Sequence, residues 1–595
     1  MTYRAPVRDQ AFILGEVLKL DGYSNLPGFA DASMETVEQI LEEGAKFCEG
    51  VLAPLNTVGD KEGCTWSQDN TVKTPTGFQS AYTQMVDGGW AALTGDAEFG
   101  GQGLPKVVGI AVSEMMSGAN MAFAMYPGLT HGAYAAINNG GSPEQKALYL
   151  PKMGTCQWGG TMNLTEPQCG TDLGLIRSKA VKADDGTYKI SGQKIWISAG
   201  EHDLAENIVH LVLARVEGAP AGVKGISLFI VPKFLPDADG NPGARNSLVC
   251  AGLEEKMGIH GNATCVMVYD EATGFLVGEE NQGLKHMFVM MNEARLGVGL
   301  QGVAIGEAAY QAAKDFALDR LQGRSLTGKK NPEGPADPII VHPDVRRMLL
   351  EAKAFMEGGR ALVLWTALQA DLEHGGADEA TRQKAADYMA LFTPVVKGYL
   401  TDKGFKTCSD AMQVHGGSGF TEHFPASQYL RDCRISMIYE GTNGIQALDL
   451  VGRKLAANGG RAVMAFFADV DALVAETAGD EALKLFSDAL ASAKAQLQEA
   501  TMWLMQNGLA NPDNAGAAST DYMHLFGITA LAQMWLLMAR AAQEKIAAGD
   551  ADPFYASKLV TGQFFVERIL PDAPSHLAKL KTGAANMMTL TADQF

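Results

Sequence analysis

Apolar residues recur at three- and four-residue steps through the first part of the chain, which is the period of an amphipathic helix. From Val37 to Cys48 they share one face, while acidic residues occupy the other. A glycine-rich string at 99–105 predicts a loop. The run Ser-Pro-Glu-Gln at 142–145 has an N-cap serine, a proline at the first helical position and a glutamine three residues after the cap, so it predicts a helix ending near Lys152. We expect an α-helical domain over residues 1–155.

The period changes after Gly154. Short runs rich in β-branched and aromatic residues follow, separated by Gly, Pro and Asp, and they predict strands at 188–198, 208–216, 225–234 and 264–270. Asp185-Gly186 between two such runs predicts a hairpin, because glycine tolerates the positive φ of the turn. We expect a β-barrel or sandwich domain over 156–280. No βαβ unit is predicted, which argues against a Rossmann-type nucleotide site.

The helical period returns over 281–455, interrupted by a loop at 323–338 before a helix that starts at Pro343. A tail over 456–595 carries an apolar stripe from Leu483 to Leu504, which predicts a helix packed against another helix. We expect a loop at 511–519 and then a buried helix, because the apolar stretch 525–539 is shorter than a bilayer span. The chain is therefore predicted to be an α+β multidomain protein with a C-terminal helical extension.

Charge and cysteine content exclude some classes of function. The formal net charge is -20, from 68 acidic and 48 basic residues, which disfavours non-specific binding to nucleic acid or anionic membranes. Eight cysteines are scattered without a CxxC pair or a histidine at zinc spacing, so neither a disulfide framework nor a metal site is expected. The N-terminal residues lack the pattern of a signal peptide, and we expect a cytoplasmic protein without a membrane span.

One carboxylate stands at a break in the apolar pattern. Glu440 lies between a run that ends near Ile438 and a turn at 441–444, after which a helix is expected from Ile445. Partial desolvation there would raise the pKa of the carboxyl and make it a proton acceptor near neutral pH. The alternative is a capping or surface acid, which the local sequence alone does not exclude.

Four separated motifs in the sequence bear on the role of Glu440. They are the Met-Asn-Leu-Thr-Glu-Pro run with its Gly-Thr-Asp continuation at 162–172, Lys-Ile-Trp-Ile-Ser at 194–198, Asn-Glu-Ala-Arg at 292–295, and the segment from Gln413 to Glu440. In this order they resemble the acyl-CoA dehydrogenase family over about residues 40–455. The resemblance implies a helical domain, a β-domain and a second helical domain, with FAD held at their junction and between subunits. Chain length, the opening residues 2–9 and the tail are most similar to one of the longer bacterial members.

The resemblance also implies roles for individual residues. Glu440 would be the catalytic base. FAD contacts are implied for Met162, Leu164, Thr165, Thr171, Trp196, Ser198, Arg320, Gln413, Gly416, Gly417, Thr442 and Asn443. Substrate contacts are implied for Thr171, Asn292, Arg295, Tyr439 and Gly441. Ser198 stands where the family usually has threonine, and the segment 321–324 lacks the usual phenylalanine.

The function implied is oxidation of a short or medium acyl-CoA thioester to the 2-enoyl-CoA by a homodimer that passes electrons to an electron-transfer flavoprotein. A longer-chain dehydrogenase and an acyl-CoA oxidase remain alternatives on the same fold. A DNA-associated member of the superfamily is a further alternative, but nine Lys and Arg against fifteen Asp and Glu from residue 460 onward argue against phosphate binding by the tail. A purely structural helical protein would leave the four motifs unexplained.

Overall fold

The computed structural model describes residues 3–595, and their contacts fall into two compact units. One, here called the helical unit, contains the chain up to Glu42, Pro105–Glu114 and Val298–Phe595. The other, the barrel unit, contains Glu43–Leu104 and Met115–Gly297. The α+β class with a helical C-terminal extension is confirmed, whereas the four domain boundaries stay predictions.

Five strands of the barrel unit close into a ring. β6 pairs with β7, β7 with β11, β11 with β5, β5 with β4, and β4 again with β6. Two further strands extend it, β3 parallel to β6 and β10 antiparallel to β11. The bounds are β3 Trp158–Asn163, β4 Lys179–Lys182, β5 Tyr188–Ser198, β6 Asn207–Val216, β7 Ile226–Pro232, β10 Leu248–Leu253 and β11 Thr264–Val277. The predicted barrel is confirmed, with β11 longer than expected.

The predicted hairpin turn and helix cap of the barrel unit are both present in the structure. Gly186 has φ +84° in the turn that joins β4 to β5. The hydroxyl of Ser142 accepts a hydrogen bond from the Gln145 amide at 3.2 Å, and the Gln145 side chain accepts one from the Ser142 amide at 3.0 Å. This capping box opens α7, Pro143–Gly154. The unit also contains α3 Ala53–Glu62, α4 Phe78–Asp87 and α6 Met121–Gly140.

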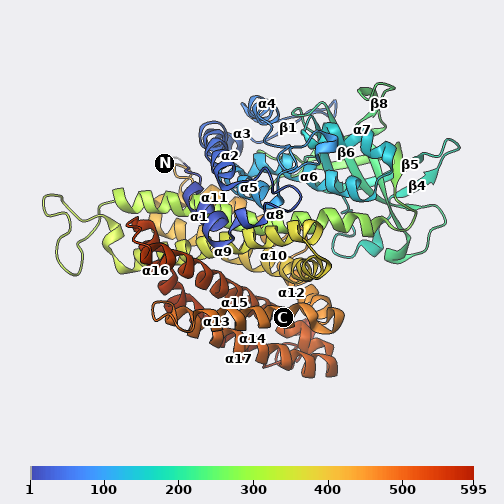
Figure 1. The fold of residues 1–595 in the computed structure, drawn as a ribbon. Coiled ribbons are helices and arrows are strands. Elements are labelled where there is room, and N and C mark those ends of the chain that lie inside the picture. The colour runs from blue at the N-terminus through green and yellow to red at the C-terminus, as the bar shows by residue number, and fades with distance from the viewer. Residues whose placement is uncertain (1–2) are drawn as a thin grey trace. The chain divides into compact units, whose positions relative to one another are not determined.

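Long helices build the helical unit (Figure 1). α9 and α10 pack against each other, and α15 of the extension packs against both. The bounds are α9 Pro343–Gly375, α10 Glu379–His415, α12 Asn443–Asp449, α13 Arg461–Thr477, α14 Lys484–Ala510, α15 Pro512–Ala547, α16 Pro553–Phe564 and α17 Ala573–Leu580. The predicted apolar stripe lies on α14 and is buried, with Leu490 and Leu497 fully enclosed.

The predicted loop at 511–519 is wrong, because α15 starts at Pro512. The Asn511 side chain accepts a hydrogen bond from the Asp513 amide at 3.0 Å, and proline is favoured at the first helical position. α15 is apolar enough to cross a membrane by composition, with a mean hydropathy of 1.4 over its most apolar window. Because 89% of that window is buried inside the protein, α15 is the core helix of the extension.

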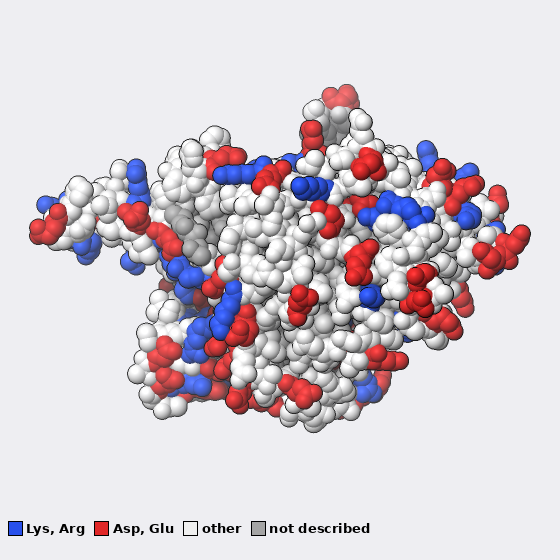
Figure 2. Space-filling model, turned by 90° about the horizontal axis from the view of Figure 1, so that it is seen from above, with Lys and Arg blue, Asp and Glu red and all other residues white. Residues whose placement is uncertain are grey.

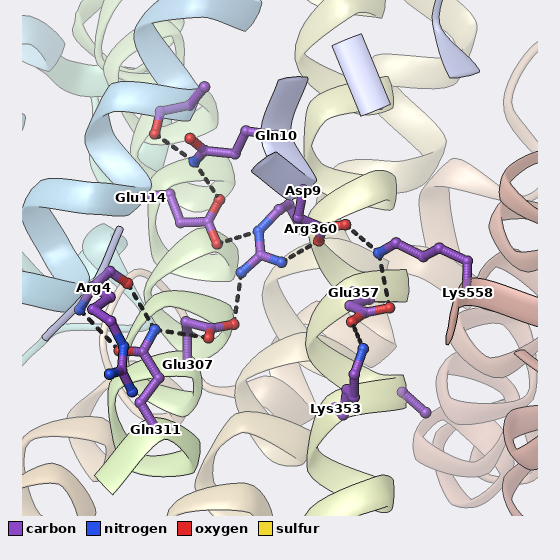
Figure 3. Close-up of polar contacts among 12 residues, drawn as sticks. Arg4, Asp9, Gln10, Glu114, Glu307, Gln311, Lys353, Glu357, Arg360 and Lys558 are labelled. Atoms are coloured by element: carbon purple, nitrogen blue, oxygen red, sulfur yellow. Dashed lines mark hydrogen bonds and ion pairs between the residues drawn. The ribbon is translucent and has the colours of Figure 1, made fainter. Parts of the chain in front are cut away.

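A buried ionic cluster joins helices that are far apart in sequence (Figure 3). The Arg360 guanidinium of α9, only 1% exposed, donates to Glu114 at 2.7 Å, to Glu307 at 2.8 Å and to Asp9. Lys558 of α16 donates to Asp9 and, at 2.8 Å, to Glu357. Asp9 belongs to α1, Val7–Phe12, Glu114 to α5, Lys106–Ala119, and Glu307 to α8, Gly283–Asp319. Burial would raise the pKa of Asp9, but the charges of Lys558 and Arg360 lower it to about 2.

Charged side chains of both signs are interspersed over the face drawn in Figure 2, which also shows wide uncharged areas between them. This face therefore presents no large area of a single charge sign.

Candidate active site

The Glu440 segment adopts a left-handed backbone. Glu440 has φ +57° and Gly441 has φ +84°, between a short 3-10 turn at Ile435–Met437 and α12. A residue with a side chain rarely adopts this conformation, and it persists only where neighbouring groups enforce it. α12 begins at Asn443 instead of the predicted Ile445, because the Thr442 hydroxyl accepts a hydrogen bond from the Ile445 amide at 3.4 Å and caps the helix.

Two buried side chains hold this backbone in place. The carbonyl of Glu440 accepts a hydrogen bond from the Gln446 amide nitrogen at 3.0 Å. The carbonyl of Gly441 accepts one from the Lys397 ammonium at 2.7 Å. Lys397 is 0% exposed and Gln446 is 1% exposed, so both contacts are shielded from water. Glu440 itself is half-buried. The raised pKa expected for its carboxyl stays a prediction.

The Asn443 side chain is directed toward α10. Its amide nitrogen contacts the Gly398 carbonyl at 3.0 Å, the Thr401 hydroxyl at 2.9 Å and Asp402 at 2.7 Å, while its oxygen accepts from Lys397 at 2.8 Å. Asn443 thus anchors the start of α12. Any contact between FAD and Asn443 falls to its backbone, and the predicted flavin roles of Thr442 and Asn443 stay predictions.

Other predicted residues of the helical unit are placed around α8 and α10. The Tyr439 hydroxyl donates to Gln301 of α8, and burial raises the pKa of Tyr439. Arg320 follows the end of α8 and is exposed, as is Gln413 in the last turn of α10. Gly416 has φ +58° and, like Gly417, has open space where a side chain would begin. A backbone of this kind permits close approach by a ligand.

Trp196 of the barrel unit lies in a β-bulge. Ile197 pairs with Cys265 and Lys194 with Met267, so two residues of β5 face the single residue Val266 of β11. Trp196 takes φ +60° there and is 62% exposed, which is unusual for an aromatic residue on a strand. Ser198, two residues further along, pairs with Thr264 and is half-buried.

A buried ion pair between Glu166 and Lys194, for which no role was predicted, supports the loop after β3. Glu166 accepts hydrogen bonds from Lys194 at 2.9 Å, from the Ser178 hydroxyl at 2.7 Å and from the Arg177 amide at 2.7 Å. Burial would raise the pKa of Glu166, but Lys194 and these donors lower it to about 2. The signal was present, because Lys194 continues the inward alternation of Tyr188 and Ile190 and a buried lysine needs an acid.

Hydrogen bonds from Lys194 and its neighbour Ile195 hold Leu164 and Thr165, two of the predicted flavin contacts. Lys194 also donates to the Leu164 carbonyl at 3.0 Å, and the Thr165 carbonyl accepts from the Ile195 amide at 3.0 Å. Met162 lies on β3 opposite Leu211 and is half-buried. The loop after β3 and the bulge with Trp196 are therefore tied to each other within the barrel unit.

The predicted substrate contacts of the barrel unit lie on different elements. Arg295 and Asn292 are neighbours on α8, with 3.5 Å between guanidinium and amide oxygen, whereas Thr171 is exposed on the loop that follows β3. On α6, Met121, Met125 and Tyr126 are each under 7% exposed. These three side chains therefore serve the core of the barrel unit.

The residues present fit a flavin dinucleotide. In the barrel unit, the exposed Trp196 indole at the bulge, with Ser198 two residues further along β5, suits a flat aromatic ring. In the helical unit, the open glycines at 416–417 suit a close backbone contact. Within residues 3–595, no group of three or more His, Cys, Asp and Glu side chains is arranged to hold a metal ion.

Family models match nearly the whole chain. The N-terminal domain model of acyl-CoA dehydrogenase matches 34–157, the middle domain 161–285 and the C-terminal domain 281–455. A fourth model, described as acetyl-CoA dehydrogenase C-terminal like, matches 466–591.

Two bacterial relatives match along the whole length of the chain. The chain is 44% identical to 3-methylmercaptopropionyl-CoA dehydrogenase of Ruegeria pomeroyi, over 99% of this chain and all of the relative. It is 36% identical to a broad-specificity linear acyl-CoA dehydrogenase of Mycobacterium tuberculosis, over the full length of both chains. The predicted similarity to a longer bacterial member is thereby confirmed, and that member is the 3-methylmercaptopropionyl-CoA enzyme.

Solved structures show the same fold. The acyl-CoA dehydrogenase of Bacillus anthracis complexed with FAD superposes with a TM-score of 0.74 at 22% identity, covering 94% of this chain and 89% of that one. Caenorhabditis elegans ACDH-11 in complex with C11-CoA gives 0.80 at 18% identity, covering 99% and 96%. The chain belongs to the acyl-CoA dehydrogenase family and is an FAD-dependent enzyme of that family, with an additional C-terminal helical domain.

Proposed function

We propose that this enzyme oxidises 3-methylmercaptopropionyl-CoA to methylthioacryloyl-CoA, a step in the catabolism of dimethylsulfoniopropionate. The observation that carries the proposal is the 44% identity, end to end, with the relative named for that substrate. Identity with the broad-specificity linear enzyme is 36%, and with a butyryl-CoA dehydrogenase of Syntrophomonas wolfei 34%. The second of these three relatives favours one alternative, a broader range of straight-chain acyl-CoA substrates.

In the proposed mechanism Glu440 takes the proton from Cα of the thioester. This proton is weakly acidic, so removing it requires a well-placed base and hydrogen-bond donors at the thioester oxygen, where negative charge develops. The family relationship supports the Glu440 backbone amide as one donor. The left-handed backbone at Glu440 and Gly441, fixed by Gln446 and Lys397, would present carboxylate and amide in a constant orientation.

FAD, when bound, supplies the acceptor for the hydride that leaves Cβ. Trp196 and Ser198 would hold the flavin ring, together with Thr165 and the backbone of Met162 and Leu164. Arg320 would hold the diphosphate of FAD. Gln413 and the glycines at 416–417 would hold its adenosine part from the neighbouring subunit of a homodimer. A guanidinium suits the diphosphate because it forms paired hydrogen bonds with phosphate oxygens.

A substrate panel tests the proposed specificity. The purified holoenzyme would be assayed with 3-methylmercaptopropionyl-, butyryl-, octanoyl- and palmitoyl-CoA, and kcat/KM compared. We expect the highest value for 3-methylmercaptopropionyl-CoA. Comparable values across the straight-chain substrates would favour the broad-range alternative, and a maximum at palmitoyl-CoA would contradict the proposal.

We propose an electron-transferring flavoprotein as the electron acceptor. A solved structure described as the electron transferring flavoprotein of Acidaminococcus fermentans superposes on this chain with a TM-score of 0.57 at 26% identity, covering 71% of this chain and 98% of that one. Turnover that requires such an acceptor and forms little peroxide in air would support the proposal. Rapid peroxide formation with oxygen alone would identify an oxidase instead.

A further inference from the structure

The structure links the backbone at Glu440 to the C-terminal extension through a chain of polar contacts. Lys397 bonds both the Gly441 carbonyl and Asn443, and Asn443 bonds Asp402 at 2.7 Å. The other carboxylate oxygen of Asp402 lies 2.8 Å from Nε2 of His524, on α15. We name these four residues, Lys397, Asn443, Asp402 and His524, the Glu440 support chain. All of them lie in the helical unit.

The contact between Asp402 and His524 depends on a close crossing of α10 and α15. A Cβ added at Gly527 would lie 2.3 Å from the Tyr399 ring, and one added at Gly398 would lie 2.3 Å from the Met523 sulfur. Both helices therefore carry glycine where they approach most closely, which leaves the backbones near enough for His524 to reach Asp402. The Tyr399 ring packs edge-on against His524 with centroids 5.4 Å apart, so the imidazole is held from the side as well.

The contact between Asp402 and His524 is largely shielded from solvent. The side chains of Asp402 and His524 are 20% and 15% exposed. His576 of α17 lies against His524 with ring centroids 5.3 Å apart, and it bonds Asp521 at 2.7 Å. Of the two histidines, His524 contacts Asp402 and His576 contacts Asp521, so only the first lies on the path to the Glu440 backbone. A substitution of His524 therefore tests the path, and the same substitution of His576 is the matched control.

We infer that His524 of the C-terminal extension, acting through Asp402 and Asn443, is a positioning residue for the catalytic base. Asp402 orients the Asn443 amide, and the Asn443 side-chain oxygen and the Gly441 carbonyl both accept hydrogen bonds from Lys397. The support chain thereby fixes Gly441, whose left-handed neighbour is Glu440, in a conformation that is unfavourable without such support. The inference rests on the proposed role of Glu440. It gives the extension a function in catalysis besides adding buried surface.

The test compares His524→Phe with His576→Phe as holoenzymes. Each would be mixed anaerobically with butyryl-CoA or 3-methylmercaptopropionyl-CoA, and the rate of flavin bleaching followed. His524→Phe keeps the ring that packs on Tyr399 but loses the bond to Asp402. A displacement of about 1 Å at reacting groups lowers a rate by roughly 100-fold, so we expect a 10- to 100-fold slower reduction with nearly unchanged substrate Kd. His576→Phe should reduce at the wild-type rate.

Three further measurements separate positioning from loss of folding. The primary isotope effect with substrate deuterated at C2 should be at least as large in His524→Phe as in wild type, since proton removal becomes slower. His524→Gln, whose amide can donate to Asp402, should recover part of the rate. Asp402→Asn should slow reduction as well, and combining it with His524→Phe should add little, because the two changes break one path.

Two results would overturn the inference. One is a wild-type reduction rate in His524→Phe, and the other is an equal loss in His576→Phe together with reduced flavin content or Tm, which would indicate general damage to the extension. Glu440→Gln measured in parallel keeps the proposed function separate. If that variant reduces its flavin normally, the base assignment fails. If it is inactive while His524→Phe is normal, the positioning role alone fails.

Discussion

Two polar networks connect the core of the helical unit to its C-terminal extension, and they differ in what they contain. The Arg360 cluster is made of full charges enclosed on all sides, with Arg360 1% and Glu114 1% exposed. The Glu440 support chain is made mostly of single hydrogen bonds and ends at a backbone with positive φ. The first network meets the demands of buried charge, whereas the second holds a conformation that the chain would not adopt unaided.

The comparison separates stability from catalysis. Enclosed charges are costly to leave unpaired, so a change in the Arg360 cluster should act mainly on folding. Changes at Asp402 and His524, the outer members of the Glu440 support chain, leave the buried Lys397 ammonium its bonds to Gly441 and Asn443, so they should act mainly on the reaction rate.

Arg360→Met should have the largest effect on stability. It leaves Asp9, Glu114 and Glu307 close together without their shared cation, and breaking a buried ion pair costs about 3–5 kcal/mol. Thermal or urea unfolding of the holoenzyme measures the loss. Arg347→Met is the matched control, because its bonds to Asp344 and Glu351 are on the surface and such pairs contribute about 0–1 kcal/mol. Equal losses in both variants would contradict the account.

Lys194→Met should destabilise the barrel unit and also weaken FAD binding. The substitution leaves Glu166 buried without its cation and removes the donor to the Leu164 carbonyl, so the loop that precedes Thr165 loses a support. We expect the free energy of unfolding to fall by about 3 kcal/mol at most if the remaining donors to Glu166 keep their hydrogen bonds. Flavin content and unfolding midpoint are measured together. A stable variant with full flavin content would refute the role given to this ion pair.

Acid should weaken both units. The pKa values of Asp9 and Glu166 are lowered to about 2 in the folded protein, below the ordinary values of 3.8 and 4.5. A depressed folded-state pKa stabilises the protein above the unfolded pKa, and this stabilisation is lost as pH falls toward the folded value. Stability should therefore fall between about pH 5 and pH 2. In Lys194→Met the part that comes from Glu166 should shrink, and an unchanged pH profile would contradict this assignment.

Gly527→Ala should lower the free energy of unfolding moderately and should slow flavin reduction more strongly. Its Cβ would overlap the Tyr399 ring, and such overpacking costs typically about 1–3 kcal/mol. Because α10 and α15 must separate, the contact between Asp402 and His524 should lengthen and flavin reduction should slow. Gly516→Ala, also on α15 but with open space around it, is the control and should retain both properties. A Gly527→Ala variant that is destabilised but reduces its flavin at the normal rate would break the link drawn between crossing and catalysis.

Gly441→Ala should have the smallest effect on stability. Its φ of +84° disfavours a side chain by roughly 1–2 kcal/mol, and a Cβ there would also approach the Gln446 amide nitrogen at 2.7 Å. The slower reduction expected should exceed what this small loss suggests, because the preceding residue is Glu440. Flavin reduction and unfolding measured on one preparation would decide whether the two effects diverge as the comparison requires.

The sequence predicted local structure well where the signals were unambiguous. The Ser142 cap, the hairpin at Asp185-Gly186 and the limits of β5 were correct. The start of α15 was missed because Asn-Pro is typical both of a loop and of a helix start, and burial of the following apolar face decides between them. The helix after Glu440 was predicted, but its start was placed at Ile445 and not at Asn443, because the Thr442 hydroxyl was not recognised as its N-cap.

The sequence predicted the residues of the candidate site but not their support. Resemblance placed Glu440 and Trp196 in the site, while the positive φ of both was visible only in the structure, because such conformations are imposed by distant contacts. Lys397 and His524 lie 43 residues before and 84 residues after Glu440. Pairings of this kind depend on how helices cross, which periodicity alone does not determine.

The proposed reaction depends most on Glu440, which acts as its base. Glu440→Gln has nearly the same shape and should keep the fold and bound FAD, while losing the group that accepts the Cα proton. The direct measurement is anaerobic mixing of the yellow Glu440→Gln holoenzyme with acyl-CoA. We predict that the flavin stays oxidised for at least a thousandfold longer than in wild type, within the range by which general-base groups accelerate reactions, about 10² to 10⁴. Bleaching of the flavin at the wild-type rate would contradict the account.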